Sequence, residues 1–274
     1  MNDIGVAGWL FHRSILNDKT MTLLELPGVC QSLGVETVEL VSTFFVSQSA
    51  GYLNELGGAI QQHDLRIRSI AVDMGNIANA DEATRRTDLE ALKQWFYVAR
   101  AIGAEAIRVN SGAASPTDTE AIDRIVKGYQ ELTAEGAHAG VYLMIENHGG
   151  ASADPKNIQL FLDRVGSPWF KACPDTGNFP GDTWEEGMRI MAPQAFSCHV
   201  KVFSYSPSGE QIWTGRDGQQ HAYDLKKCLH ILADAKYSGP LCVESGASAT
   251  EIESAREAIR YVRELVTTVT NLSG

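Results

Sequence analysis

Short apolar runs alternate with longer amphipathic segments from one end of the chain to the other. Short apolar runs between turn residues indicate buried strands, and the longer segments have the spacing of amphipathic helices. Eight runs are predicted as strands: residues 4–9, 35–41, 67–72, 106–109, 141–145, 170–174, 196–200 and 240–243.

An even series of eight strand and helix pairs favours a closed parallel barrel over an open, doubly wound sheet. No Pro- or Ser-rich linker interrupts the series, so the sequence predicts one α/β domain, a (β/α)8 TIM barrel over residues 1–274. Such barrels run to about 250 residues as one domain. With 44% hydrophobic and 21% charged residues, the composition is that of a globular protein with a large core.

The formal net charge of -11 gives a surface that repels phosphate backbones and anionic lipids, and no basic patch reverses it. We therefore expect no nucleic-acid partner. No stretch approaches the ~20 apolar residues that span a bilayer, so no membrane association is expected. The five cysteines lack C-x-x-C spacing and the first residues lack a signal-peptide pattern, which makes the cytoplasm the expected compartment. The sequence leaves a homo-oligomer open.

Polar residues end four neighbouring strands of the predicted barrel. Glu146 follows the fifth run, Asp175 the sixth, and Glu244 the eighth, while His199 lies near the end of the seventh. Active sites of (β/α)8 barrels lie at the carboxyl ends of the strands, so we expect these four side chains to converge there.

Three carboxylates gathered without a counter-charge would repel one another and raise one another's pKa values. A cation between them removes this conflict, and the sequence therefore predicts one divalent metal ion on Glu146, Asp175, His199 and Glu244. Oxygen and imidazole ligands without thiolate suit manganese, magnesium, cobalt or zinc, and the ligand types do not choose among them.

These strand ends also carry a resemblance. Ile145-Glu146-Asn147-His148, Asp175-Thr176-Gly177-Asn178, His199-Val200-Lys201 and Val243-Glu244 resemble, in order and separation, the xylose isomerase-like barrel superfamily of sugar isomerases and epimerases. The resemblance spans almost the whole chain. It implies a metal-dependent isomerase or epimerase of a small sugar, keto-sugar or cyclitol, with Glu146 and Glu244 as the acid/base pair beside a metal-bound carbonyl. Carboxylates on opposite faces of an acidified C–H can exchange its proton.

Other functions stay open at this point. The same superfamily contains dehydratases of inososes and lyases that eliminate from keto-glycosides, all of which begin with the same deprotonation. Ketose epimerases of the superfamily often carry histidine where this chain has Asn178, which leaves the substrate open. A DNA-repair endonuclease is disfavoured by the negative charge. A non-catalytic barrel subunit of a larger enzyme is a further alternative.

Six further polar residues are candidates for binding a sugar substrate, since we expect them at strand ends or in loops of the barrel mouth: His12, Glu39, Asn110, His148, Lys201 and Arg216. Each has an alternative. His12 could pack at the rim, Asn110 could cap a turn, and Glu39 could be a salt-bridged core residue. His148 could support Glu146, and Lys201 could pair with Asp175. Arg216, in a long loop that is typical of a lid, could be solvated.

Overall fold

The computed structural model describes residues 3–214 and 218–272. Eight parallel strands form one sheet in the order β6-β5-β4-β3-β2-β1-β10-β7. Their bounds are β1 Ile4–Ala7, β2 Thr37–Val41, β3 Arg66–Val72, β4 Ala106–Val109, β5 Tyr142–Glu146, β6 Phe170–Cys173, β7 Cys198–Lys201 and β10 Leu241–Ser245.

Backbone hydrogen bonds between the segments of β6 and β7 close the sheet into a barrel. The N–H of Phe196 donates to the carbonyl of Ala172 at 2.8 Å, and the N–H of His199 donates to the carbonyl of Pro174 at 2.9 Å. Every strand of the sheet is thereby hydrogen-bonded on both sides. The predicted single-domain α/β barrel is confirmed.

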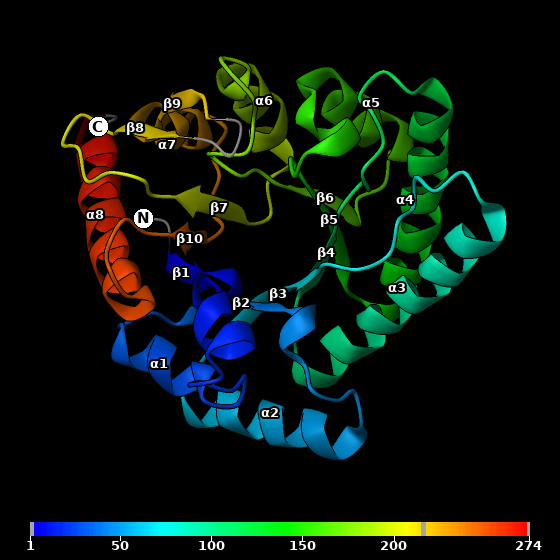
Figure 1. Cartoon of the computed structure of the whole chain (residues 1–274), viewed down its shortest axis with the longest axis horizontal. Helices are drawn as coiled ribbons and strands as arrows, with labels where there is room; N and C mark the ends of the chain where they lie inside the picture. The colour runs from blue at the N-terminus through cyan, green and yellow to red at the C-terminus, as the bar shows by residue number, and fades with distance from the viewer. Residues whose placement is uncertain (1–2, 215–217, 273–274) are drawn as a thin grey trace.

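An α-helix follows each strand of the barrel before the next one begins, and the helices surround the sheet (Figure 1). Their bounds are α1 Leu26–Ser32, α2 Ala50–Gln62, α3 Glu82–Ile102, α4 Thr119–Ala139, α5 Pro155–Val165, α6 Trp184–Met191, α7 Leu225–Asp234 and α8 Glu251–Leu272. Left-handed glycines end α3 and α4, where Gly103 and Gly140 have φ of 77° and 73°, respectively. Within the described ranges, no helix has the length and apolar character needed to cross a membrane.

The strands lie where the apolar runs predict them, with ends that differ by at most two residues. β1 ends at Ala7 because Gly8–Phe11 turns into a 3-10 helix. The larger difference follows β7, where the expected long loop contains an antiparallel hairpin of β8 Glu210–Thr214 and β9 Gln220–Asp224. Residues 215–217 of this segment, including the candidate Arg216, lie outside the described residues.

The hairpin is attached at its base to the barrel. The buried Gln211 accepts backbone hydrogen bonds from Phe203 and Ser204 through its Oε1 and donates from Nε2 to the hydroxyl of Tyr261 at 3.1 Å. Tyr223 of β9 is buried and hydrogen-bonds the hydroxyl of Thr176, the residue that follows Asp175. The hairpin therefore supports the carboxyl ends of β6 and β7.

Candidate metal centre and active site

Side chains two positions apart on a strand point to the same face of a sheet, so each strand stacks residues in layers inside the barrel. One inner layer is apolar and packs apart from the main core: Ala106, Met144 and Cys173. Two positions further along the chain stand Arg108, Glu146 and Asp175, all of them buried. The alternation of each strand therefore places these charged side chains in the next layer toward the barrel mouth.

Two more strands complete a compact cluster of candidate metal ligands. One oxygen or nitrogen from each of Glu146, Asp175, His199 and Glu244 lies within 4.8 Å of the others, and all four residues are buried. His199 Nδ1 lies 2.8 Å from Glu146 Oε1, 3.8 Å from Glu244 Oε1 and 4.0 Å from Asp175 Oδ2. The ring nitrogen Nδ1 thus faces the three carboxylates.

The opposite nitrogen of His199 faces Glu39, the buried glutamate of β2. His199 Nε2 lies 2.9 Å from Glu39 Oε1, although the angle is poor for a hydrogen bond. The other oxygen of Glu39 accepts a hydrogen bond from the hydroxyl of Ser69 at 2.7 Å. A carboxylate in this position keeps a proton on Nε2 of the histidine, the nitrogen that faces it. The other nitrogen, Nδ1, is then free to bind a metal.

Arg108 is a buried cation, with only 3% of the residue exposed. Its Nε lies 3.2 Å from Glu146 Oε2 without hydrogen-bond alignment, and its Nη1 donates to Asp73 Oδ1 at 2.7 Å and to Asn110 Oδ1 at 2.8 Å. Burial alone would raise the pKa of Glu146, but the charges of Arg108 and His199 outweigh it and lower that pKa. Glu146 is therefore held ionised.

Lys201 is the second cation of the cluster. Its Nζ donates to Asp175 Oδ2 at 2.7 Å and also contacts Glu244 Oε2. Burial would raise the pKa of Glu244, but Lys201 and His199 together lower it. The pKa of Asp175 is raised to about 7, because burial and the charges of Glu244 and Glu146 outweigh the effect of Lys201. Lys201 therefore offsets only part of the repulsion that Asp175 experiences from Glu146 and Glu244.

The charge of the whole cluster fits a divalent cation. Five acidic residues are involved: Glu39, Asp73, Glu146, Asp175 and Glu244. They face two permanent cations, Arg108 and Lys201, so three negative charges remain uncompensated when His199 is neutral. A divalent ion would reduce this excess to one, and it would take three carboxylates and one imidazole as ligands, a donor set that such ions accept.

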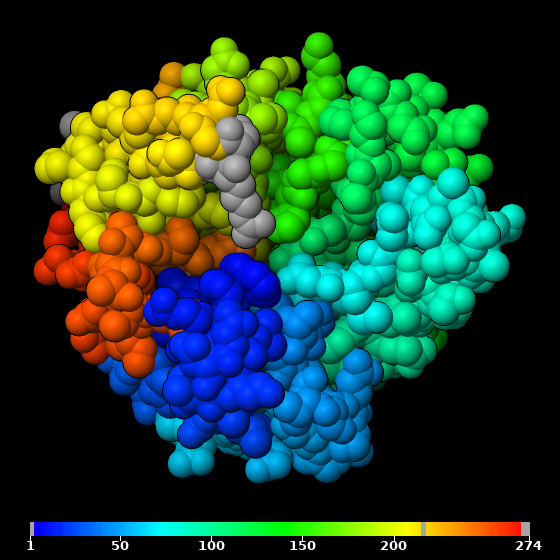
Figure 2. Space-filling model, viewed as in Figure 1, coloured from blue at the N-terminus to red at the C-terminus, as the bar shows by residue number. Residues whose placement is uncertain are grey.

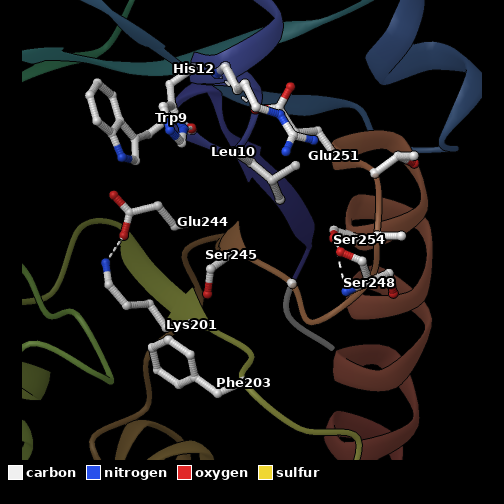
Figure 3. Close-up of a pocket in the computed structure, with 14 residues that line it drawn as sticks. Trp9, Leu10, His12, Lys201, Phe203, Glu244, Ser245, Ser248, Glu251 and Ser254 are labelled. Atoms are coloured by element: carbon white, nitrogen blue, oxygen red, sulfur yellow. Dashed lines mark hydrogen bonds and ion pairs between the residues drawn. The ribbon is translucent and has the colours of Figure 1, made fainter. Parts of the chain in front are cut away.

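A cavity of about 400 Å³ opens beside this cluster (Figure 3). Glu244 and Lys201 line it together with residues that follow β1, β7 and β10 and residues at the start of α8. On the face shown in Figure 2, the segment after β10, in orange, lies between the segment after β1, in blue, and the segment after β7, in yellow. The cluster is therefore reached from the barrel mouth.

Only some of the described candidate substrate residues line the cavity. His12 and Lys201 line the cavity. Glu39 and Asn110 instead contact His199 and Arg108, and His148 is exposed, with its N–H bonded to Ser152 Oγ.

Arg108 and Asp73 are site residues that the sequence analysis missed. The single arginine within the short apolar run Ala106–Val109 could have indicated a site residue. A charged side chain is rarely buried without a partner, so a buried arginine implies a carboxylate nearby. Asp73 directly follows β3 and was the matching strand-end carboxylate. Phe203 of the cavity wall follows Lys201 by two positions, and no pattern in the sequence distinguishes it from other aromatic residues.

The chain belongs to the xylose isomerase-like TIM barrel family, whose model matches residues 28–265. It matches none of the curated proteins. Among solved structures it is similar to an L-ribulose 3-epimerase, with 17% identity, a TM-score of 0.78 and coverage of 100% of this chain and 97% of the other.

Two further solved structures share the fold. A 3-keto-D-glucoside 4-epimerase from E. coli has 13% identity and a TM-score of 0.71, with coverage of 97% of this chain and 100% of the other. A xylose isomerase-like TIM barrel protein from Mycobacterium smegmatis in complex with magnesium has 14% identity, a TM-score of 0.71 and coverage of 98% of both chains. At these identities the likeness establishes the fold.

Proposed function

We propose that this protein is a divalent-metal-dependent isomerase or epimerase of a small sugar, keto-sugar or cyclitol, which acts by removing a proton next to a carbonyl. The observation that carries the proposal is the buried group Glu146, Asp175, His199 and Glu244, which lies beside a cavity at the barrel mouth. The similar solved structures include a 3-epimerase and a 4-epimerase of sugars, which supports the proposal.

Glu146, Asp175, His199 and Glu244 would hold the ion. When bound, it supplies positive charge beside the carbonyl oxygen and so acidifies the adjacent C–H. Glu244 reaches the cavity and takes the proton as general base, because its carboxylate is held ionised by Lys201. Lys201 donates a hydrogen bond to the substrate oxygen that gains negative charge, and Glu146 is the second carboxylate of an acid/base pair.

A lyase is the second candidate, and one observation favours it. Only Glu244 of the two glutamates lines the cavity, whereas Glu146 is fully buried with one oxygen 3.2 Å from Arg108. A single accessible base is sufficient for elimination, in which the proton leaves one carbon and water or an alcohol leaves the next. Epimerisation requires a proton to return to the opposite face.

Turnover in heavy water tests the proposal. The purified chain, loaded in turn with manganese, magnesium, cobalt and zinc, is incubated with a panel of keto-sugars and inososes. We expect deuterium at one carbon of the product and loss of turnover in Glu244→Gln. Product of unchanged mass apart from deuterium indicates isomerisation, and loss of water or an alcohol indicates a lyase. An isomer of the substrate that forms without any deuterium would contradict the proposed proton exchange. An elimination product need not carry deuterium, because the carbon that loses its proton becomes unsaturated.

A further inference from the structure

The regular pairing of β5 with β6 stops at the candidate metal centre. Its last pair joins Glu146 to Cys173. Asn147 is the residue after Glu146, and Asp175 lies two positions beyond Cys173. Asp175 is fully buried, so its backbone N–H and carbonyl need partners that this ladder does not supply.

The side chain of Asn147 supplies both of these partners. Asn147 is fully buried, its Oδ1 accepts the N–H of Asp175 at 2.8 Å, and its Nδ2 donates to the carbonyl of Asp175 at 3.0 Å. The orientation of the amide follows from these contacts, because an N–H only donates and a carbonyl only accepts. A neighbouring strand would offer the same pair of groups. The side chain of Asn147 therefore ties the segment after β6 to the end of β5.

This bridge fixes the backbone of Asp175, and two other contacts direct its carboxylate. Oδ1 accepts the N–H of Gly177 at 2.7 Å, and Oδ2 accepts from Lys201 Nζ at 2.7 Å. Because Glu146 directly precedes Asn147, the bridge also sets the spacing between two candidate ligands that come from different strands. A change at Asn147 would alter this spacing without removing any atom that binds the ion.

We propose that Asn147 is a positioning residue of the metal centre, which holds Asp175 at the spacing from Glu146 that a divalent ion requires. The proposal rests on the proposed function for the presence of the ion. Asn147 is not part of the cavity lining, so it acts through Asp175 and not on the substrate. Replacing a residue that orients a ligand in this way typically weakens metal binding about 10- to 100-fold.

Asn157 provides a matched control for Asn147. It is 7% exposed, and its Nδ2 donates to the carbonyls of Pro116 and Ala151 at 2.9 and 3.0 Å, neither of which belongs to a candidate ligand. Asn147→Leu and Asn157→Leu each remove two hydrogen bonds with little change in side-chain volume. Both variants should lower the Tm, because buried backbone groups are left without partners.

Manganese binding separates a positioning role from a purely structural one. Calorimetry should show affinity about 10- to 100-fold lower in Asn147→Leu and changed by less than about twofold in Asn157→Leu. The electron paramagnetic resonance spectrum of bound manganese, which reports the symmetry of its ligands, should change in Asn147→Leu alone. If the leucine variant does not fold, Asn147→Ser takes its place with the same expected results. Equal affinities and identical spectra for the variants at the two positions would overturn the proposal.

Amide hydrogen exchange in the demetallated protein keeps this proposal distinct from the proposed function. The N–H of His199, which donates to the carbonyl of Pro174 at 2.9 Å, is the internal reference. Relative to it, the N–H of Asp175 should exchange at least about tenfold faster in Asn147→Leu and at an unchanged rate in Asn157→Leu. This result would uphold the positioning of Asp175 even if no ion bound, in which case the proposed metal chemistry alone would fail. Unchanged exchange at Asp175 in Asn147→Leu would overturn the role of Asn147 even in a protein that binds metal.

Discussion

Replacing Arg108 with methionine should destabilise the protein, because the carboxylate of Glu146 loses its buried cationic partner. The guanidinium is 3% exposed and lies 3.2 Å from Glu146 Oε2, and Glu146 has no exposure to water. Removing one partner of a buried ion pair costs about 3–5 kcal/mol, because the other charge is left uncompensated. Asp73 loses the same partner but is 27% exposed, so water offsets most of its loss.

The expected cost corresponds to a fall in Tm of roughly 6–20 °C, from about 2–4 °C per kcal/mol in chains of this size. Urea unfolding followed by circular dichroism measures it, first in a chelator and then with saturating manganese. We expect a smaller cost with metal present, because the ion takes over part of the charge of Glu146. The double variant Arg108→Met/Glu146→Gln should recover stability, since both partners are then uncharged.

Arg68 provides a matched control at the other end of the barrel. Its side chain is 12% exposed and its Nη1 lies 2.8 Å from Glu105 Oε2, far along the strands from the candidate ligands. Arg68→Met should also lower stability, yet the cost should be the same with and without metal. The reasoning is refuted if Arg108→Met unfolds at the urea concentration of the unmodified protein, or if metal changes the two single variants equally.

Three other results are expected. Glu39→Gln should weaken metal binding about 10- to 100-fold in calorimetry while the fold is retained, because the carboxylate that orients His199 is lost; unchanged affinity would remove Glu39 from the site. Lys201→Met should lower the Tm of the chelator-treated protein and enlarge the Tm rise on adding metal, because the ammonium no longer competes for Asp175 and Glu244; an equal or smaller rise would contradict this competition. Metal affinity should fall at least tenfold per pH unit below about pH 7, because the pKa values of Asp175 and His199 are both raised and their protons must leave before the ion binds; affinity that is flat between pH 5 and 7 would show that neither residue holds a proton there.

The barrel itself could be predicted from the alternation of apolar runs and helical segments, because strand and helix periods are local properties of the sequence. The family resemblance was also confirmed, over residues 28–265. The hairpin after β7 was missed because Glu210–Thr214 and Gln220–Asp224 are short and largely polar, so no apolar run marked them.

The candidate ligands could be predicted because barrel topology brings the carboxyl ends of neighbouring strands together. The contacts that these ligands make could not be predicted from the sequence, since such contacts depend on the directions of side chains across the barrel. Glu39 is an example: its position between apolar neighbours indicated a residue that points into the barrel mouth, but only the structure places it behind His199 instead of in the cavity. Arg108 is another, because its partners Asp73 and Glu146 lie 35 and 38 positions away in the chain.

Metal binding by the demetallated protein is the most direct test of the central claim that three carboxylates and an imidazole hold one divalent ion. Calorimetric titration with manganese, supported by elemental analysis, should give one ion per chain. Asp175→Asn should lower the affinity at least a hundredfold, whereas Asp163→Asn, at an exposed position on α5, should leave it unchanged. Failure to bind manganese, magnesium, cobalt or zinc, or equal affinity in the two variants, would contradict the claim.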